Sequence, residues 1–204
     1  MNGRDLTLGI AAGLAVAGMV AQRRRGSRKV VEKPVLIRTI VIPARPDSAA
    51  RKGWSASTGA IWLNPTGSLE AIQSGGGGVS VYPVEGGVPA LPARAREAVE
   101  QLARDARIAM PTHAYSVSDA YSEGGARHLY RALAEVVAKE NAVLISSACT
   151  DGRTSPEASE MWSKLSSEIC VVDARDRNSS EWYDEDEDLD LAGDDCFVAW
   201  GGPR

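Results

Sequence analysis

Residues 115–165 read YSVSDAYSEGGARHLYRALAEVVAKENAVLISSACTDGRTSPEASEMWSKL, and this stretch does most to decide the fold. Its order is a β-type segment, a glycine pair, an amphipathic helix, an apolar run, a polar loop and a second helix. Between residues 127 and 140, apolar residues recur at helical spacing while charged residues occupy the other faces, which is typical of a helix with one buried side. The apolar stripe is Leu129, Leu133, Val136 and Val137. The stretch therefore predicts a β-loop-α-β-α unit.

An unbroken apolar run follows this helix. Residues 142–145, Ala-Val-Leu-Ile, suit a short strand that is covered on both faces. The second helix is expected to begin after Ser155, because serine caps a first turn, Pro156 is tolerated at the first helical position and Glu157 matches the positive end of a helix. The apolar stripe predicted for it is Ala158, Met161, Trp162 and Leu165.

The glycine pair is the feature with the most chemical interest. Gly124 and Gly125 let the backbone approach a ligand, and the free N–H groups of a first helical turn can receive phosphate oxygens. The candidate cofactor-binding residues are Gly124, Gly125, Ala126 and Arg127. A glycine pair before a helix is also found in plain tight turns, so a structural role and a binding role both stay open.

Several short motifs of the unit occur together in one known family. They are Gly124-Gly125-Ala126 in the loop, Leu129-Tyr130 on the helix, Ser146-Ser147 after the strand, Ser155 to Trp162, and Asp194-Asp195-Cys196. In this order they resemble the GCN5-related N-acetyltransferase (GNAT) family, and in particular the GNAT-like proteins of tailed phages. The resemblance covers about residues 112–196. It implies an α/β (α+β) domain with a GNAT-like mixed sheet flanked by helices, and a loop that holds the pyrophosphate of acetyl-CoA.

Composition limits the function classes. The chain has 204 residues, a formal net charge of −4 and two histidines, which argues against a nucleic-acid partner and against a histidine-rich metal centre. Three widely spaced cysteines, Cys149, Cys170 and Cys196, indicate neither a disulfide framework nor a C-x-x-C metal site. Reduced thiols in a domain that faces the cytosol are therefore expected.

Residues 1–33 differ from the rest of the chain. Residues 6–21 carry no charge, and Arg23, Arg24 and Arg25 follow directly. As a helix this segment would be about 24 Å long, short of the ~30 Å of a bilayer core, so that spanning is possible but tight. We expect an anchor helix and basic linker at residues 1–33, and an α/β domain at residues 34–204.

Three interpretations of the apolar segment compete. A cleaved signal peptide is disfavoured because its basic cluster follows the apolar run. A transmembrane anchor is favoured, and the same cluster would then keep the domain on the cytoplasmic side. The third interpretation is a helix buried against a virion protein of a portal, capsid or tail. Gly9, Gly13 and Ala17 form a small-residue ridge that would let two such helices pack, so a homo-oligomer is also expected.

The remaining segments supply further strands and one helix. Strands are predicted at residues 35–42, 54–63, 79–82, 112–118 and 169–172, with residues 196–200 as a terminal edge strand. The helix is predicted at residues 93–108, the glycine run 74–78 as a hairpin end, and the acidic run 184–190 as a solvated loop.

Two classes of function fit these expectations. The first is a non-catalytic accessory or virion-associated structural protein, attached to a membrane or virion protein through residues 6–21. The second is an acyl-CoA-dependent N-acyltransferase, in which His113, on the strand that leads to the loop, is the candidate catalytic base. The acyl acceptor is not defined by the sequence, and whether the chain is an enzyme stays open.

Overall fold

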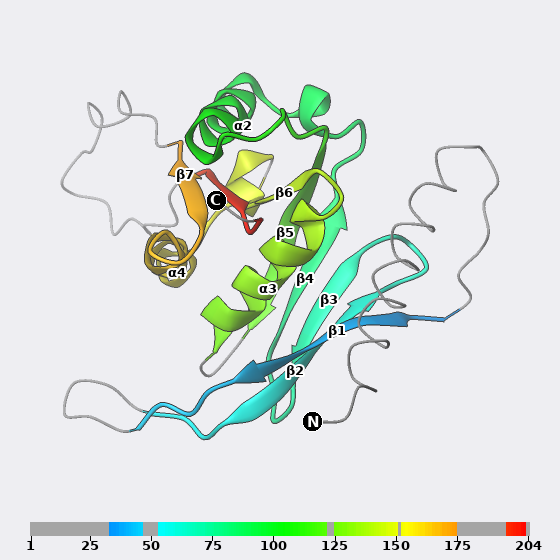
Figure 1. Cartoon of the computed structure of the whole chain (residues 1–204), viewed down its shortest axis with the longest axis vertical. Helices are drawn as coiled ribbons and strands as arrows, with labels where there is room; N and C mark the ends of the chain where they lie inside the picture. The colour runs from blue at the N-terminus through cyan, green and yellow to red at the C-terminus, as the bar shows by residue number, and fades with distance from the viewer. Residues whose placement is uncertain (1–32, 47–52, 122–124, 151, 175–194, 203–204) are drawn as a thin grey trace, which may run out of the picture.

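The protein folds as an α+β domain around one mixed sheet (Figure 1). The computed structural model describes residues 33–46, 53–121, 125–150, 152–174 and 195–202. Within these ranges it contains eight strands and three α-helices. The mixed α/β class predicted from the sequence is confirmed. The predicted helix at residues 6–21, Gly124 and the acidic run 184–190 lie outside the described residues.

The strands occur in the sheet in the order β1-β2-β3-β4-β5-β6-β8-β7. The strand bounds are β1 Val35–Ile42, β2 Ser57–Leu63, β3 Leu69–Gln73, β4 Gly78–Pro83, β5 His113–Tyr121, β6 Ala142–Ile145, β7 Cys170–Asp173 and β8 Phe197–Trp200. Neighbouring strands are antiparallel, except that β5 and β6 are parallel. The first five strands thus form a meander, and a helical crossover then leads to β6, as a parallel pair requires.

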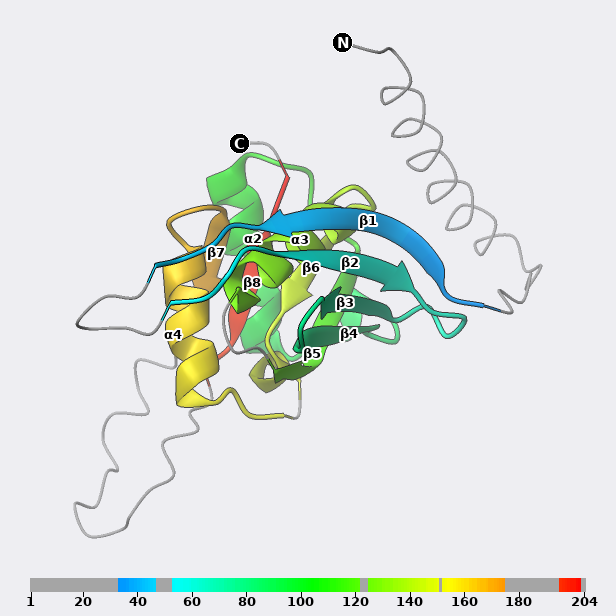
Figure 2. The same ribbon diagram turned by 90° about the horizontal axis from the view of Figure 1, so that it is seen from below.

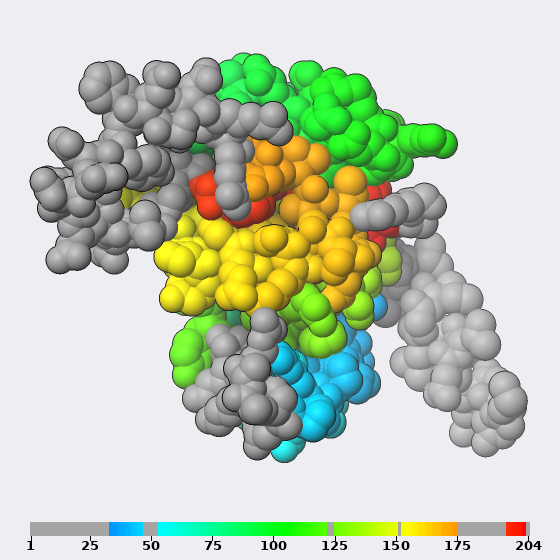
Figure 3. All heavy atoms as spheres, turned by 90° about the vertical axis from the view of Figure 1, so that its left-hand side faces the viewer, coloured from blue at the N-terminus to red at the C-terminus, as the bar shows by residue number. Residues whose placement is uncertain are grey.

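Helices cover both faces of the sheet, but unevenly. Their bounds are α2 Ala93–Ala106, α3 Ala126–Ala138 and α4 Pro156–Leu165. One buried cluster packs α3 and α4 against one face, and a second cluster packs α2 against the other. Figure 3 shows α4 in yellow on one side of the molecule, with α2 in green above it and β1 and β2 in blue and cyan below it. In β8, Phe197 and Ala199 belong to the first cluster and Val198 and Trp200 to the second, so this strand is buried on both faces.

The local patterns predicted most of these elements. All four stripe residues of α3 are buried, and Trp162 and Leu165 are buried on α4. Ser155 caps α4 as expected, since its side chain accepts a hydrogen bond from the Ala158 N–H at 3.2 Å. Positive φ angles at Gly75, Gly76 and Gly77 lie in the glycine run that was predicted as a hairpin end, and this turn joins β3 to β4.

One strand was missed, and the predicted position of another in the sheet was wrong. Strand β3 was not predicted, because Leu-Glu-Ala-Ile-Gln is short and has no run of β-branched residues. The terminal strand was predicted at an edge, whereas β8 lies between β6 and β7, so β7 is the edge strand at this end of the sheet. Strand order depends on contacts between distant segments, which local patterns do not encode.

The prediction of three reduced thiols was wrong. Cys149 and Cys196 form a disulfide with a Cα–Cα distance of 4.6 Å, and Cys170 is not part of this bond. Cys149 follows β6 and Cys196 precedes β8, and the pairing of these two strands brings the cysteines together. The sequence separation of 47 hides this proximity.

Candidate functional site

The candidate site lies at the carboxyl ends of the parallel strands β5 and β6. The two strands pair from His113 with Ala142 to Ser116 with Ile145. Strand β6 ends there, whereas β5 continues to Tyr121 and pairs with β4 over that length. In open α/β sheets, ligands bind outside the carboxyl ends of parallel strands. The end of β5 and the start of α3 therefore form the part of the fold that is best placed for a ligand.

A bulge shapes the far half of β5. Val81 pairs with Val117 and Ser80 with Asp119, so Ser118 is an extra residue in β5. The Ser118 hydroxyl donates a hydrogen bond to the Ser80 carbonyl at 3.3 Å. Bulges of this kind redirect a strand next to a site. The sequence contained no signal for this bulge.

Gly125 begins α3 with a left-handed backbone. Its φ is +84°, and a Cβ there would lie 2.8 Å from Ile42 Cγ2 on β1 and 3.4 Å from Gln73 Oε1 on β3. A side chain is therefore excluded both by the backbone conformation and by the packing of α3 on the sheet. These two structural reasons account for glycine at this position without a ligand. The N–H groups of Ala126 and Arg127 still belong to the first helical turn, where no partner exists within the helix.

The side chain of Arg127 is held by an ion-pair network. Arg127 Nε lies 2.8 Å from Glu168 Oε1, and Arg131 Nη1 lies 3.0 Å from Glu168 Oε2. Arg131 also contacts Glu135 at 3.5 Å, and Glu135 pairs with Arg38 of β1. The network links β1, α3 and the turn after α4. The Arg127 side chain is thus ion-paired along the surface of α3. The sequence did not reveal this ion pair because Glu168 lies far along the chain.

His128, which the sequence analysis did not select, lies beside this network. Burial lowers its pKa, and the positive charges of Arg131 and Arg127 lower the pKa further, although Glu168 opposes them. The imidazole is therefore neutral at pH 7. Its Nδ1 atom is buried and has no hydrogen-bond partner among the described residues.

His113 lies at the opposite end of β5 from the glycine loop. It is the first of nine residues of this strand, and eight steps of about 3.3 Å place it roughly 26 Å from Tyr121. The side chain is exposed, and its Nδ1 lies 2.8 Å from the Thr112 hydroxyl. The structure therefore does not bring the candidate base together with the candidate cofactor-binding residues at the start of α3.

Tyr130 packs inward instead of lining the loop. Its ring meets Trp162 edge to face at 5.1 Å, and Trp162 stacks on Phe197 at 5.8 Å. Burial raises the pKa of Tyr130 well above its ordinary value, and the charge of Asp119 adds to this rise. The hydroxyl therefore stays protonated, and the side chain belongs to the core between α3, α4 and β8.

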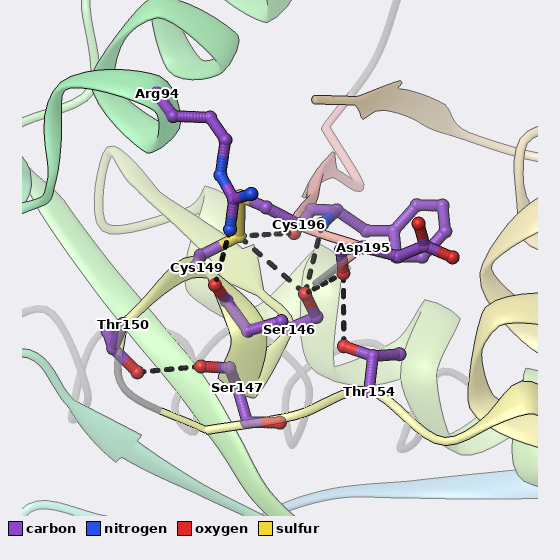
Figure 4. The surroundings of a disulfide bond; sticks show 10 residues. Arg94, Ser146, Ser147, Cys149, Thr150, Thr154, Asp195 and Cys196 are labelled. Carbon is purple, nitrogen blue, oxygen red and sulfur yellow. Dashed lines mark hydrogen bonds between the residues drawn. A yellow bond between two sulfur atoms is a disulfide. The ribbon is translucent and has the colours of Figure 1, made fainter. Parts of the chain in front are cut away.

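A polar cluster surrounds the disulfide at the end of β6 (Figure 4). The Ser146 hydroxyl accepts a hydrogen bond from the Phe197 N–H at 3.0 Å and donates one to the Asp195 carbonyl at 3.1 Å. The Thr154 hydroxyl donates to the same carbonyl at 3.0 Å, and the Ser159 hydroxyl donates to Asp195 Oδ2 at 3.0 Å. These bonds satisfy Ser146 within the fold. The cluster therefore joins the segment after β6 to the start of β8.

No family model, curated protein or solved structure matches this chain. In the part of the chain that the structure describes, no group of three or more His, Cys, Asp or Glu side chains is arranged to hold a metal ion. Among the described helices, none has both the length and the apolar character that crossing a bilayer requires.

Proposed function

We propose that this chain is a non-catalytic accessory protein of the phage-virion type, with a GNAT-like fold and with residues 6–21 as its attachment to a membrane or a protein assembly. The observation that carries the proposal is the separation of His113 from the start of α3. A general base must come within hydrogen-bond reach of the proton that it removes, directly or through one water molecule. A histidine at the far end of a nine-residue strand does not meet this requirement.

The GNAT-like interpretation is supported by the path of the chain. Strand β5 leads through the glycine loop into α3, and α3 crosses over to the parallel strand β6. The two parallel strands pair only up to Ser116 and Ile145, so the far half of β5 is free on the β6 side. This is the region where the family would hold acetyl-CoA, and here the first turn of α3 offers backbone N–H donors.

The buried disulfide favours the virion over the cytoplasmic side of a membrane. Cys149 and Cys196 are 1% and 0% exposed, which places the bond in the core. Disulfides persist in oxidising surroundings and are rare in proteins that stay in a reducing cytosol. A protein that is carried in a particle leaves the cytosol, so a virion location agrees with this bond.

The second candidate function is acyl-CoA-dependent N-acyl transfer. One observation favours it: the first-turn N–H groups of Ala126 and Arg127 lie at the carboxyl end of β5, where phosphate oxygens are well bound. Acetyl-CoA would supply the acyl group, and Gly125, Ala126 and Arg127 would hold its pyrophosphate. Tyr130 and His113 would not take part, because one is buried and the other lies at the opposite end of β5.

Calorimetry of the full chain with acetyl-CoA distinguishes the two functions. The accessory role predicts no binding heat up to millimolar acetyl-CoA and no acetylation of added amines. Saturable binding together with amine acetylation would refute it. Arg127→Ala is the better probe of a bound pyrophosphate, because a side chain at Gly125 would disturb the packing on Ile42 whether or not CoA binds.

Vesicle flotation tests the attachment. Leu14 lies in the middle of residues 6–21, so Leu14→Arg places a charge in the apolar segment. Flotation of the wild type that Leu14→Arg abolishes identifies a membrane partner. If the wild type does not float but binds virion proteins, and Leu14→Arg disrupts this binding, the partner of the segment is a protein assembly. If Leu14→Arg affects neither contact, the attachment role of the segment is wrong.

A further inference from the structure

Half of one sheet face has no covering layer among the described residues. Helix α2 packs on the part of this face that β5, β6 and β8 provide, through Ala114, Val143, Ile145 and Val198. The corresponding side of β1 to β4 points away from α3 and is left bare, and Figure 2 shows these four strands side by side. We call it the open face and define it by Leu36, Val41, Trp62, Glu70, Ile72 and Tyr82.

Apolar residues of the open face gather on β1, β2 and β3, whereas Tyr82 on β4 is separated from Trp62 by Glu70. Leu36 pairs with Trp62 across β1 and β2, and Trp62 pairs with Glu70 across β2 and β3. Val41 is 75% exposed and Ile72 47% exposed. A shallow hollow of about 550 Å³ lies over β1, β2 and β3, with Val41, Trp62 and Ile72 among its lining residues. Single exposed apolar side chains are ordinary, but a joined set of this kind indicates a contact surface.

We propose that residues 6–21 pack on the open face of their own chain before the protein is attached to its membrane or assembly. This apolar segment has no charge over 16 residues, and β1 begins at Val35, on the border of the open face. The intervening residues 22–34 span up to about 43 Å when extended, which exceeds the roughly 23 Å length of the eight-residue strand β1. The segment therefore reaches any point of the open face.

The sizes of the two surfaces agree. A 16-residue helix is about 24 Å long and about 10 Å wide. Four strands spaced by about 4.8 Å place β1 and β4 about 14 Å apart. One helix laid along the strands therefore covers most of the open face. Because the segment and the open face belong to one chain, the effective concentration of the segment at this face is far higher than that of the same segment from a second molecule.

Charge supports the same arrangement. Glu70 lies within the open face next to Trp62. Its carboxylate forms no ion pair with a described residue. Arg28 and Lys29 precede Val35 by only seven and six residues, so they reach this carboxylate when the apolar segment folds back.

The packing leaves the attachment role intact. A helix that is apolar all round buries one side on the sheet and keeps the other side for a membrane or a protein partner. The packing forms before attachment. A failed vesicle or assembly experiment would therefore refute the attachment, and a failed crosslinking experiment would refute the packing.

Photo-crosslinking of the full chain tests the packing. A benzophenone amino acid replaces Ile72 on the open face, and the protein is irradiated at low micromolar concentration without lipid. Mass spectrometry should find the main crosslink to residues 6–21 in a product of monomer mass. The matched control places the same amino acid at Ser163, an exposed position of α4 on the other side of the sheet, and should give no crosslink to this segment.

Leu14→Arg provides the second arm of the test. It should lower the yield of the crosslink from position 72 by about tenfold or more, because an unpaired charge in an apolar contact is strongly unfavourable. A melting curve of Leu14→Arg that equals that of the wild type shows that the α+β domain of the variant remains folded. The proposal is overturned if position 72 gives no crosslink to residues 6–21. It is also overturned if the products join two chains, since a second copy then covers the open face.

Discussion

Loss of the Cys149–Cys196 disulfide should destabilise the protein by about 4 kcal/mol. The bond closes a loop with a sequence separation of 47, and the chain-entropy relation for cross-links gives about 13.6 cal/mol/K for this length, or about 4 kcal/mol at 25 °C. For a protein of 150 to 250 residues, each kcal/mol moves Tm by about 2–4 °C, so a fall of roughly 8–16 °C is expected.

The assay compares oxidised and reduced protein without changing a side chain. The protein is refolded in a glutathione buffer or in dithiothreitol, and both forms are melted under otherwise equal conditions. Because both sulfurs are buried, reduction must be done on the unfolded chain. Alkylation in denaturant should label one cysteine of the oxidised form and three of the reduced form.

Two variants control this measurement. Cys170→Ser removes the thiol that is not part of the disulfide and should keep the full difference in Tm between oxidised and reduced protein. Cys149→Ser should melt at the same temperature in both buffers. Three labelled thiols after oxidative refolding, or equal melting temperatures of the two wild-type forms, would refute the disulfide and the stability argument built on it.

Three further predictions concern α3. Leu133→Ala empties a fully buried site and should cost about 2–5 kcal/mol in urea unfolding, whereas a loss under about 0.5 kcal/mol would place this residue at the surface. Gly125→Ala should lower Tm more than Gly76→Ala. Both backbones are left-handed, but only the new Cβ at position 125 meets a neighbour, Ile42 at 2.8 Å. Equal losses of Tm would contradict this packing. Since the pKa of His128 is lowered in the folded state, the unfolded chain binds more protons below pH 6.5, and stability should fall as the pH drops below this value. His128→Gln should flatten that fall in a urea series from pH 7 to pH 5, and an unaltered slope would exclude His128 as its source.

The sequence alone determined the elements whose residue pattern is local. The stripe of α3 repeats at helical spacing, so its buried face follows from the chain itself. The cap of α4 depends on Ser155 and the three residues after it. Strand β1 consists of β-type residues between Pro34 and Pro43, and its bounds were predicted without error. Each of these features is set by neighbours within a few residues.

Local patterns predicted only part of the candidate site. The position of Gly125 before a helix was predicted, and the structure confirms that α3 begins directly after it. The choice of His113 as a base near this loop was wrong, because the strand predicted at residues 112–118 continues to Tyr121 and places the histidine at its far end. The pairing of Arg127 with Glu168 could not be predicted in the same way, because nothing near either residue specifies the other.

Only the tertiary structure decided the contacts between distant segments. The insertion of β8 between β6 and β7 joins Cys149 to Cys196, and the packing of α3 on β1 joins Arg38 to Glu135, 97 residues along the chain. The same packing explains why Gly125 tolerates no side chain. The physical reason is that caps, turns and helical periods depend on neighbours in the chain, whereas strand order, disulfide pairing and ion pairs between elements depend on how the whole sheet and its helices bury their apolar faces together.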